Sequence, residues 1–430
     1  MQYIGKKQKY NKINVLFAIV YLINGYLIIS NLCSIYNMKN IIFNARFSTW
    51  IMGLMLIISA FCFFINVINR NKFPLIIWIS AIFAFWTVLS TLFNYSIQKD
   101  NIFITLANQL FWWSTLILGY LAFRKGKKAK SMKITVGGLF FTVFILYMQY
   151  VLNINKYVFV TPNMVNSYYY CLLFLPFVLT IKKTYIKNIF IGLIMFAALL
   201  SMKRTAFLAI ILSLMVNYSV MMLISGRSIR KKIRVFFYFF IVAALSFIFY
   251  DFIKETYNLD ILLRFKSIEI DGGSGRNFIY KSVWYELIEF DFAFWLIGKG
   301  YNGVLLNSSI GLSAHNDFLE VLYDYGLIGL ILYTIFIAKL IKYGIDFIKT
   351  KHVNADAYAA SLMIFFTISM ASHLIIYPTY FMLLILFWAW QIGGLESSNN
   401  NVKVMKLSRI GPENGRGENK SANFSNCTSI

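Results

Sequence analysis

Residues 205–224 read TAFLAIILSLMVNYSVMMLI, and residues 227–234 just beyond them read RSIRKKIR. An uncharged run of this length crosses about 30 Å of hydrocarbon as a single helix. A basic cluster directly after such a run is typical of the cytoplasmic side of a membrane. This one segment therefore indicates both a membrane helix and its direction.

Apolar runs of the same kind recur along the whole chain. The sequence has 430 residues, of which 59% are hydrophobic and 13% are charged. Soluble domains have about 45–50% apolar and about 25% charged residues. The sequence predicts an all-α, polytopic integral membrane protein of about twelve transmembrane helices. These helices are expected at 13–32, 47–68, 74–93, 102–123, 134–152, 164–181, 188–202, 205–224, 233–251, 317–341, 355–374 and 376–394.

The distribution of charge predicts the orientation of these helices. With the amino terminus in the cytoplasm, 29 of the 41 basic residues fall on the cytoplasmic side, as the positive-inside rule expects. We expect helices one to nine within 1–251, an extracytoplasmic loop at 252–316, helices ten to twelve within 317–394, and a disordered cytoplasmic tail at 395–430. The net charge of +24 is explained by this topology, so the lipid bilayer and not a nucleic acid is the expected partner.

The outer loop contains a predicted amphipathic helix that begins near Asn277. Its apolar residues follow a helical period, and they are Ile279, Tyr280, Val283, Trp284, Leu287 and Ile288. Ser282, Glu286 and Glu289 share the opposite face. Phe290, Phe292, Phe294 and Trp295 follow, and they suit either stacking on sugar rings or, as we favour, anchoring in the membrane interface.

His315 precedes the tenth predicted helix at the outer membrane surface. Asn316 is expected to cap that helix, which places Asp317 in its first turn. A histidine at this place has a pKa suited to accepting a proton from a hydroxyl group. The alternative is a surface histidine that only forms hydrogen bonds. His373 lies near the outer end of the eleventh helix, outside this motif, and we expect it to be dispensable.

Three acidic residues follow His315 on one face of the tenth helix, namely Asp317, Glu320 and Asp324. They are spaced either to coordinate a cation, to orient the histidine, or to form a solvated stripe, which the sequence favours. The four cysteines, Cys33, Cys62, Cys171 and Cys427, have no paired spacing, which argues against a disulfide framework and a thiolate metal site. We expect no metal and no cofactor.

Lys203 and Arg204 form a basic pair between two apolar runs on the predicted outer side, against the positive-inside bias. Placing a charged side chain beside a membrane span costs enough free energy to suggest a functional role. An arginine fork fits phosphate oxygens well, and Arg276 in the outer loop is a second such residue. The alternative for each arginine is a side chain that only reaches the lipid headgroups.

Five segments between about 160 and 330 together resemble the superfamily of O-antigen polymerases and O-antigen ligases. These are TPNMVNSYYYCLLFLP at 161–176, SMKRTAFLA at 201–209, SGRNFIYKSVW at 274–284, GKGYNG at 298–303 and HNDFLEVLYDYGLIG at 315–329. The chain has Lys203 where the family has a serine before the arginine. The resemblance implies a membrane glycosyltransferase fold of the GT-C-like type and a bacterial protein of the cytoplasmic membrane.

The resemblance also implies a reaction, which is the polymerisation of undecaprenyl-pyrophosphate-linked oligosaccharide repeat units into a polysaccharide. His315 would act on the acceptor hydroxyl, and Arg204, Arg276 and Lys203 would bind the pyrophosphate. Asn316 and Glu320 would support the site. The transfer would be inverting and independent of a metal, with a flippase and a chain-length regulator as further partners.

Two other functions stay open from the sequence. An O-antigen-type ligase would use the same residues to transfer the glycan to a different acceptor. A flippase or transporter for the same lipid would fit twelve helices equally well, but it predicts two related halves and charges that face a central cavity. The charges here cluster in the outer loop, which favours the polymerase.

Overall fold

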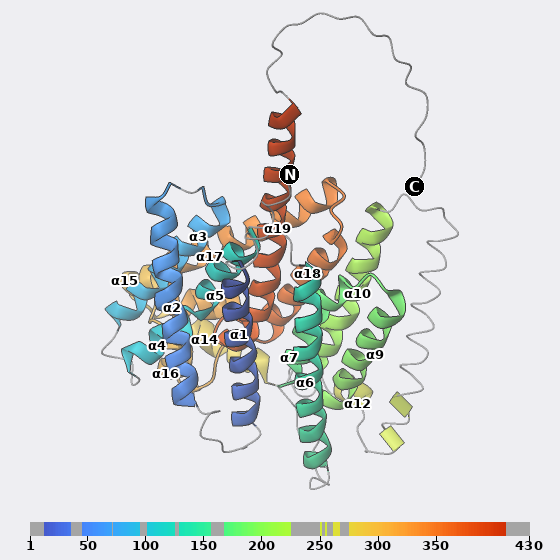
Figure 1. Cartoon of the computed structure of the whole chain (residues 1–430). Coiled ribbons are helices and arrows are strands. Elements are labelled where there is room, and N and C mark those ends of the chain that lie inside the picture. Colours follow the sequence, from blue (N-terminus) through green and yellow to red (C-terminus); the bar gives the residue numbers. More distant parts are fainter. Residues whose placement is uncertain are drawn as a thin grey trace, which may run out of the picture.

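A computed structural model describes residues 13–35, 45–70, 72–94, 101–124, 129–155, 167–224, 250–251, 254–255, 261–266 and 275–409. All regular structure in these ranges is helical (Figure 1). The helices are α1 (Ile13–Ile35), α2 (Ala45–Ile68), α3 (Leu75–Phe93), α4 (Ile102–Gln109), α5 (Phe111–Arg124), α6 (Ala129–Asn155), α7 (Tyr168–Leu173), α8 (Leu175–Leu179), α9 (Thr184–Ser201), α10 (Arg204–Ile224), α12 (Ile261–Lys266), α14 (Arg276–Ile288), α15 (Phe292–Ile297), α16 (Gly303–Asn307), α17 (Asp317–Lys349), α18 (Ala355–Ala371) and α19 (Pro378–Arg409).

The all-helical prediction is confirmed, and the protein is a multi-pass membrane protein. Among the described residues, 6 helices are long and apolar enough to cross a membrane, or 7 if the bent pair α4 and α5 counts as one span. Shorter apolar helices lie within α1, α6, α7–α8 and α18. The total of twelve stays a prediction, because the helix expected at 233–251 lies almost wholly outside the described residues.

Two predicted spans are broken. The span expected at 102–123 bends by 47° between α4 and α5, where Gln109 accepts a hydrogen bond from Thr91 and donates one to Tyr325. The span expected at 164–181 is divided at Phe174 into α7 and α8. Pro176 explains this second break, because proline has no backbone N–H to continue the helical pattern.

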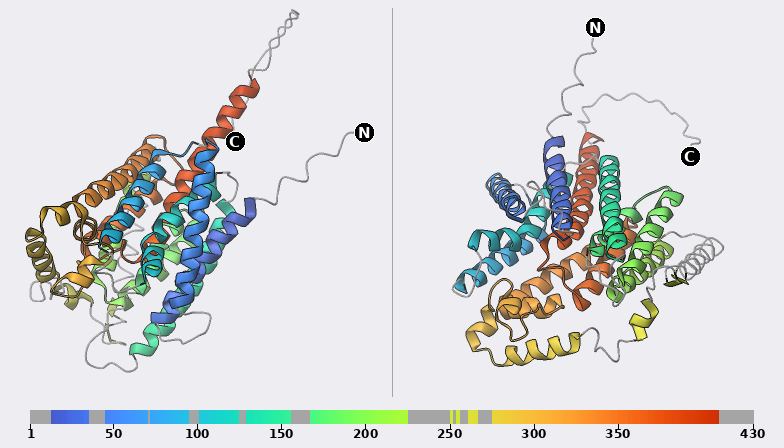
Figure 2. Two further views of the ribbon diagram at one scale, coloured as in Figure 1. Left: turned by 90° about the vertical axis from the view of Figure 1, so that its left-hand side faces the viewer. Right: turned by 90° about the horizontal axis from the view of Figure 1, so that it is seen from below.

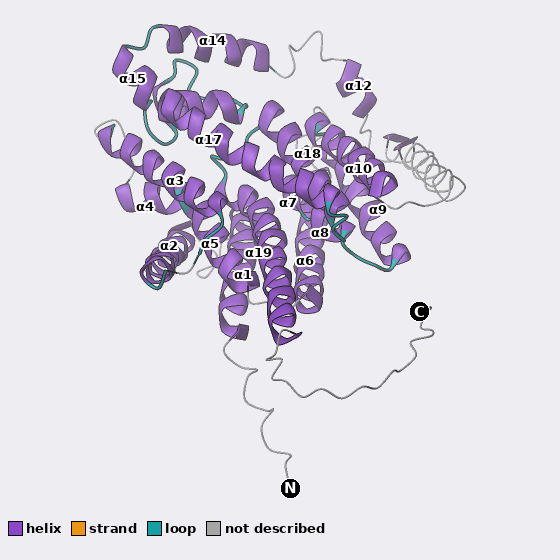
Figure 3. Cartoon of the chain, turned by 90° about the horizontal axis from the view of Figure 1, so that it is seen from above, coloured by secondary structure: helices purple, strands orange, loops and turns teal. Residues whose placement is uncertain are grey.

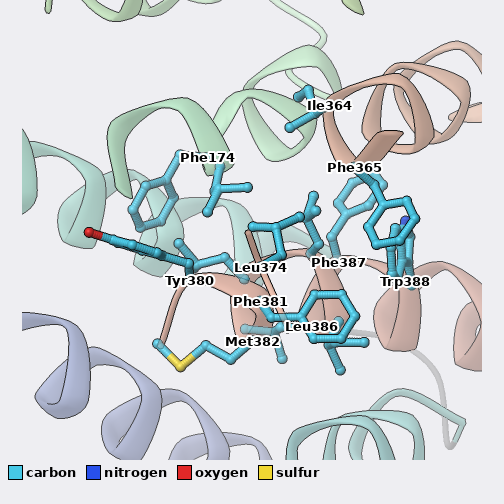
Figure 4. Packing of buried hydrophobic residues seen from close by; sticks show 14 of the residues in the cluster. Phe174, Ile364, Phe365, Leu374, Tyr380, Phe381, Met382, Leu386, Phe387 and Trp388 are labelled. Atoms are coloured by element: carbon cyan, nitrogen blue, oxygen red, sulfur yellow. The ribbon is translucent and has the colours of Figure 1, made fainter. Parts of the chain in front are cut away.

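Helix α19 forms the centre of the core. Nearly all of its apolar part, Pro378–Glu396, is buried inside the molecule. Its aromatic residues pack against α18 and the α7–α8 pair (Figure 4), and Figure 2 shows the helix running through the middle of the molecule. It continues to Arg409, past the predicted end at 394 and into the segment expected to be disordered. Extending an existing helix through polar residues costs little.

Small residues let α5 and α19 approach closely. A Cβ atom on Gly119 would lie 3.0 Å from the Cβ of Ala389, and one on Gly393 would lie 3.0 Å from the carbonyl oxygen of Tyr120. Such close contacts supply the dispersion energy that holds helices together where water is absent. An ion pair of 3.4 Å between Arg124 Nε and Glu396 Oε2 adds a polar link between the two helices.

Helix α17 breaks at Gly326, where φ is 66° and ψ is −171°. The break frees backbone carbonyls that the segment around Gly298 then uses. The N–H of Lys299 donates to the carbonyl of Tyr323 at 3.0 Å, and that of Gly300 donates to the carbonyl of Asp324 at 2.7 Å. The GKGYNG segment and the start of α17 therefore form one interlocked unit.

Polar side chains of α3 hold this unit in place. Ser90 donates to the carbonyls of both Ile297 and Asp324, and Asn94 donates to the carbonyl of Gly298. The indole N–H of Trp86 donates to the carbonyl of Tyr325. Non-helical backbone at membrane depth is tolerated only where protein satisfies its polar groups, and α3 provides that here.

Helices α14 and α15 pack across the start of α17 (Figure 3). Helix α14 confirms the expected amphipathic helix but buries a narrower face, made of Ile279, Val283 and Leu287. Trp284 and Ile288, expected on the same face, are 48% and 58% exposed. Spacing of four residues keeps a straight stripe against α16 and α17, and the flanking positions turn away from it.

Replacing Gly326 by alanine tests the interlocked unit. A Cβ there would lie 2.2 Å from the carbonyl oxygen of Leu296, and the positive φ adds strain. We expect Gly326→Ala to abolish most folded protein, measured as the monodisperse fraction after detergent extraction. Gly192→Ala in α9 is the matched control, because its Cβ would meet nothing within 4 Å. Equal yields for both variants would contradict the packing described here.

Candidate active site

His315 lies in a strained turn directly before α17. Its φ is 53°, in the left-handed region that costs a non-glycine residue about 1–3 kcal/mol. Asn316 caps α17 as predicted, because its side-chain oxygen accepts from the N–H groups of Phe318 and Leu319. Tyr280 of α14 donates to the carbonyl oxygen of His315 at 3.1 Å. The turn is thus fixed on both sides of the histidine.

Two cations lie close to the His315 ring. Burial is the main cause that lowers the pKa of His315 to about 4, and the charges of Arg276 and Lys203 lower it further. A histidine with this lowered pKa is neutral near pH 7, and only the neutral ring accepts a proton. The structure therefore brings three of the predicted site residues, His315, Arg276 and Lys203, into one electrostatic neighbourhood in which the neutral imidazole is favoured.

The basic pair lies at the sharp corner between α9 and α10. Met202 takes a left-handed conformation with φ of 53°, and the Lys203 N–H donates to the Ser201 hydroxyl oxygen at 3.2 Å. Arg204 is the first residue of α10 and is 9% exposed. The next residue, Thr205, accepts a hydrogen bond from Arg276 Nη1 at 3.3 Å.

This contact joins the first turns of α10 and α14, while α17 begins two residues after His315. Helix N-termini carry partial positive charge and attract anions. Tyr169 of α7 lies beside this corner, within reach of Ser372, Thr205 and Arg276. The corner is therefore a cationic region next to a neutral imidazole.

His373 lies beside His315, a contact that the sequence analysis did not predict. Its ring stacks on that of His315, with centroids 4.8 Å apart and planes inclined by 23°. Ser313 Oγ lies 3.3 Å from His373 Nδ1. Burial, followed by the charges of His315, Lys203 and Arg276, lowers the pKa of His373 to about 3. One signal for this placement was available, since the eleventh helix was predicted to end on the same membrane side as His315.

The three carboxylates of α17 are fully buried, so the expected solvated stripe is wrong. Asp317 accepts hydrogen bonds from Ser369 Oγ and from the N–H groups of Leu374 and Ile375. Glu320 accepts from the N–H of Ala314, the residue before His315, at 2.6 Å. Asp317 therefore holds the turn after α18, and Glu320 holds the loop that precedes α17.

The third carboxylate holds a different loop. Asp324 Oδ1 accepts from the N–H of Val304 at 3.1 Å, at the start of α16. Among the described residues, no group of three or more His, Cys, Asp or Glu side chains has the geometry of a metal site.

Glu286 also has a role that the helical period did not show. Placed by the sequence on an open polar face, its carboxylate instead accepts from the N–H and Oγ of Ser309 and from the hydroxyl of Tyr323. It thereby fastens α14 to both the loop and α17.

Residues 189–334 match the family model Wzy_C, described as O-antigen ligase. The chain contains an O-antigen ligase domain. This domain begins within α9 and ends within α17, so it includes Lys203, Arg204, Arg276 and His315, whereas His373 lies beyond it. No curated protein matches the chain.

Asp317 offers a test of how the O-antigen ligase domain is joined to α18. Asp317→Ala leaves two backbone N–H groups and one hydroxyl without an acceptor in a buried place, at a cost of about 1–3 kcal/mol for each group. We expect a clearly lower Tm in detergent. Asp346→Ala, at an exposed position of the same helix, should melt near the wild type. A Tm loss of the same size in both variants would count against the anchoring role.

Proposed function

We propose that the protein polymerises undecaprenyl-pyrophosphate-linked oligosaccharide repeat units on the outer face of a bacterial cytoplasmic membrane. The observation that carries this proposal is that His315 lies within the electrostatic reach of two cations, Arg276 and Lys203, and that all three belong to an O-antigen ligase domain. A base beside a cationic surface suits a reaction in which a hydroxyl loses a proton while an anionic group departs.

The reaction is an inverting glycosyl transfer in one step. The acceptor hydroxyl oxygen attacks the anomeric carbon of the lipid-linked chain, and the bond from that carbon to the pyrophosphate oxygen breaks. His315 takes the hydroxyl proton. Undecaprenyl pyrophosphate leaves with the bonding electron pair, and Arg276, Arg204 and Lys203 balance its charge. Because pyrophosphate is a good leaving group, the proposal needs no metal and no cofactor.

The supporting residues act through the backbone. Asn316 caps α17 and so fixes the turn that carries His315. Glu320 holds the Ala314 N–H on the other side of the same histidine. Neither residue is proposed to touch the substrate. The whole fold is proposed to be of the GT-C-like type, and a flippase and a chain-length regulator are its proposed protein partners.

A ligase is the second candidate, because O-antigen ligase is the description of the matching family. It would use the same residues but transfer the glycan to an acceptor other than a second lipid-linked repeat unit. A flippase for the same lipid is a third outcome that the same assay detects.

Reconstituted protein tests the reaction class. Given lipid-pyrophosphate-linked repeat units as both donor and acceptor, the wild type should lengthen them in the presence of a chelator and release undecaprenyl pyrophosphate. His315→Ala should lower the rate by about 10²–10⁴-fold, with normal membrane insertion. Lipid movement across the vesicle without lengthening would identify a flippase, and transfer only to a different acceptor would identify a ligase. An unimpaired His315→Ala would remove the proposed base.

Arg204→Lys tests the phosphate-binding role separately. Lysine keeps the charge but loses the planar fork that bonds two phosphate oxygens. We expect a rate lower by about 10-fold or more, which corresponds to about 1.4 kcal/mol. Arg70→Lys is the control, because Arg70 is exposed and outside the site. Arg204→Lys with full activity would show that only charge is needed there.

A further inference from the structure

A column of four stacked rings runs from the site into the core. His315 stacks on His373, as described above. His373 stacks in turn on Tyr377, with centroids 4.5 Å apart and planes inclined by 16°. Tyr377 stacks on Tyr380 at 5.5 Å and 28°, and Tyr380 is a buried residue of α19. One end of the column is the proposed base, and the other end is anchored in the central helix.

The loops that carry the two histidines are joined at two further places. Ser313, two residues before His315, lies 3.3 Å from His373 Nδ1. Asp317, two residues after His315, accepts from the N–H groups of Leu374 and Ile375, which directly follow His373. Each histidine is therefore bracketed by contacts to the other loop, and the stacking does not depend on one weak contact.

The second nitrogen of His315 makes the stacking significant. A ligating or catalytic histidine is usually oriented by a hydrogen bond from its other ring nitrogen to a carboxylate or carbonyl. His315 Nδ1 is buried and has no hydrogen-bond partner among the described residues. Asp317 and Glu320, the acids that closely follow His315 in the sequence, accept from backbone N–H groups of loops. Some other contact must hold the plane of this ring.

We propose that His373 is a positioning residue, whose stacked ring fixes the plane of the His315 imidazole and keeps water from its face. This proposal rests on the proposed function, because it assigns how the base of that reaction is oriented. A displacement of about 1 Å in a catalytic group can cost about 10²-fold in rate. A stacked ring prevents rotation of the imidazole without placing a charge beside it.

The surroundings favour a stacking role over a proton relay. The charged groups that act on both rings are the cations Arg276 and Lys203. The other neighbours are the neutral Tyr280, Tyr377 and Ser313. Burial and the same cations act on both rings, but the pKa of His373 is lowered to about 3 and that of His315 to about 4, so His373 is the harder ring to protonate. His373 therefore remains a neutral aromatic platform while His315 takes the proton.

Three variants of His373 test this proposal in the reconstituted polymerisation assay. His373→Phe keeps a flat ring, whereas His373→Gln and His373→Ala remove it. For Gln and Ala we expect kcat to fall by about 10- to 100-fold, with KM nearly unchanged. His373→Phe should stay within a few-fold of the wild type. His352→Ala, whose ring packs on Phe347 away from the site, should keep full activity.

The pH profile provides a readout that general loosening of the fold would not produce. Removing the ring admits water to His315 and relieves the burial that lowers its pKa. The acid limb of kcat/KM, which reports the free enzyme, should then move from near pH 4 towards the ordinary histidine value of about 6.5. This shift is expected for His373→Gln and His373→Ala but not for His373→Phe. His373→Gln replaces His373→Ala if the latter fails to fold.

The outcomes separate this inference from the proposed function. A fully active His315→Ala would overturn the proposed reaction itself. With His315→Ala inactive, wild-type kcat and an unchanged acid limb in both ringless variants would overturn the role of His373. A His373→Phe variant as impaired as His373→Ala would also overturn it, because it would show that a ring nitrogen and not the stacked ring is required.

Discussion

The burial of three carboxylates on the first two turns of α17 is the constraint on which the described site depends. A buried carboxylate needs hydrogen-bond donors, since losing water without replacement is very costly. Asp317 takes its donors from the turn after α18, Glu320 from the residue before His315, and Asp324 from the start of α16. Moving any of these loops would leave an acid without partners. One helix end therefore positions both histidines.

The break at Gly326 extends the same principle to backbone groups. A continuous helix would have used the carbonyls of Tyr323 and Asp324 internally, and the loop around Gly298 would have had no partner. Because the helix breaks, these carbonyls accept from Lys299 and Gly300, and α3 satisfies the neighbouring groups with Ser90 and Trp86. In the presence of lipid, such mutual satisfaction allows a loop to lie at membrane depth.

Much of the helical layout could be predicted from the sequence, because span length and apolar composition are local properties. The cap at Asn316 was also predictable, since a cap depends on its own residue and the next three. The hydrogen bonds of Glu320 and Glu286 could not be predicted, because periodicity shows which face of a helix a residue occupies but not what covers that face. The contact between His373 and His315 could not be predicted for a related reason. His373 is 58 residues from His315, and only the packing of α18 against α17 brings them together.

The distribution of charge across the site follows from which groups the buried carboxylates bond to. Had Asp317 or Glu320 paired with Arg276, the cationic corner would have lost its attraction for an anion. Those carboxylates accept hydrogen bonds from backbone N–H groups instead, and Arg276 donates to the neutral Thr205. The positive charge remains beside the imidazole of His315, where it lowers the pKa of that ring and favours the binding of an anion such as a pyrophosphate. A single electrostatic arrangement thus serves both the base and the leaving-group site of the proposed reaction. Its cationic half and His315 lie within the O-antigen ligase domain, while His373 lies beyond that domain, in the turn after α18.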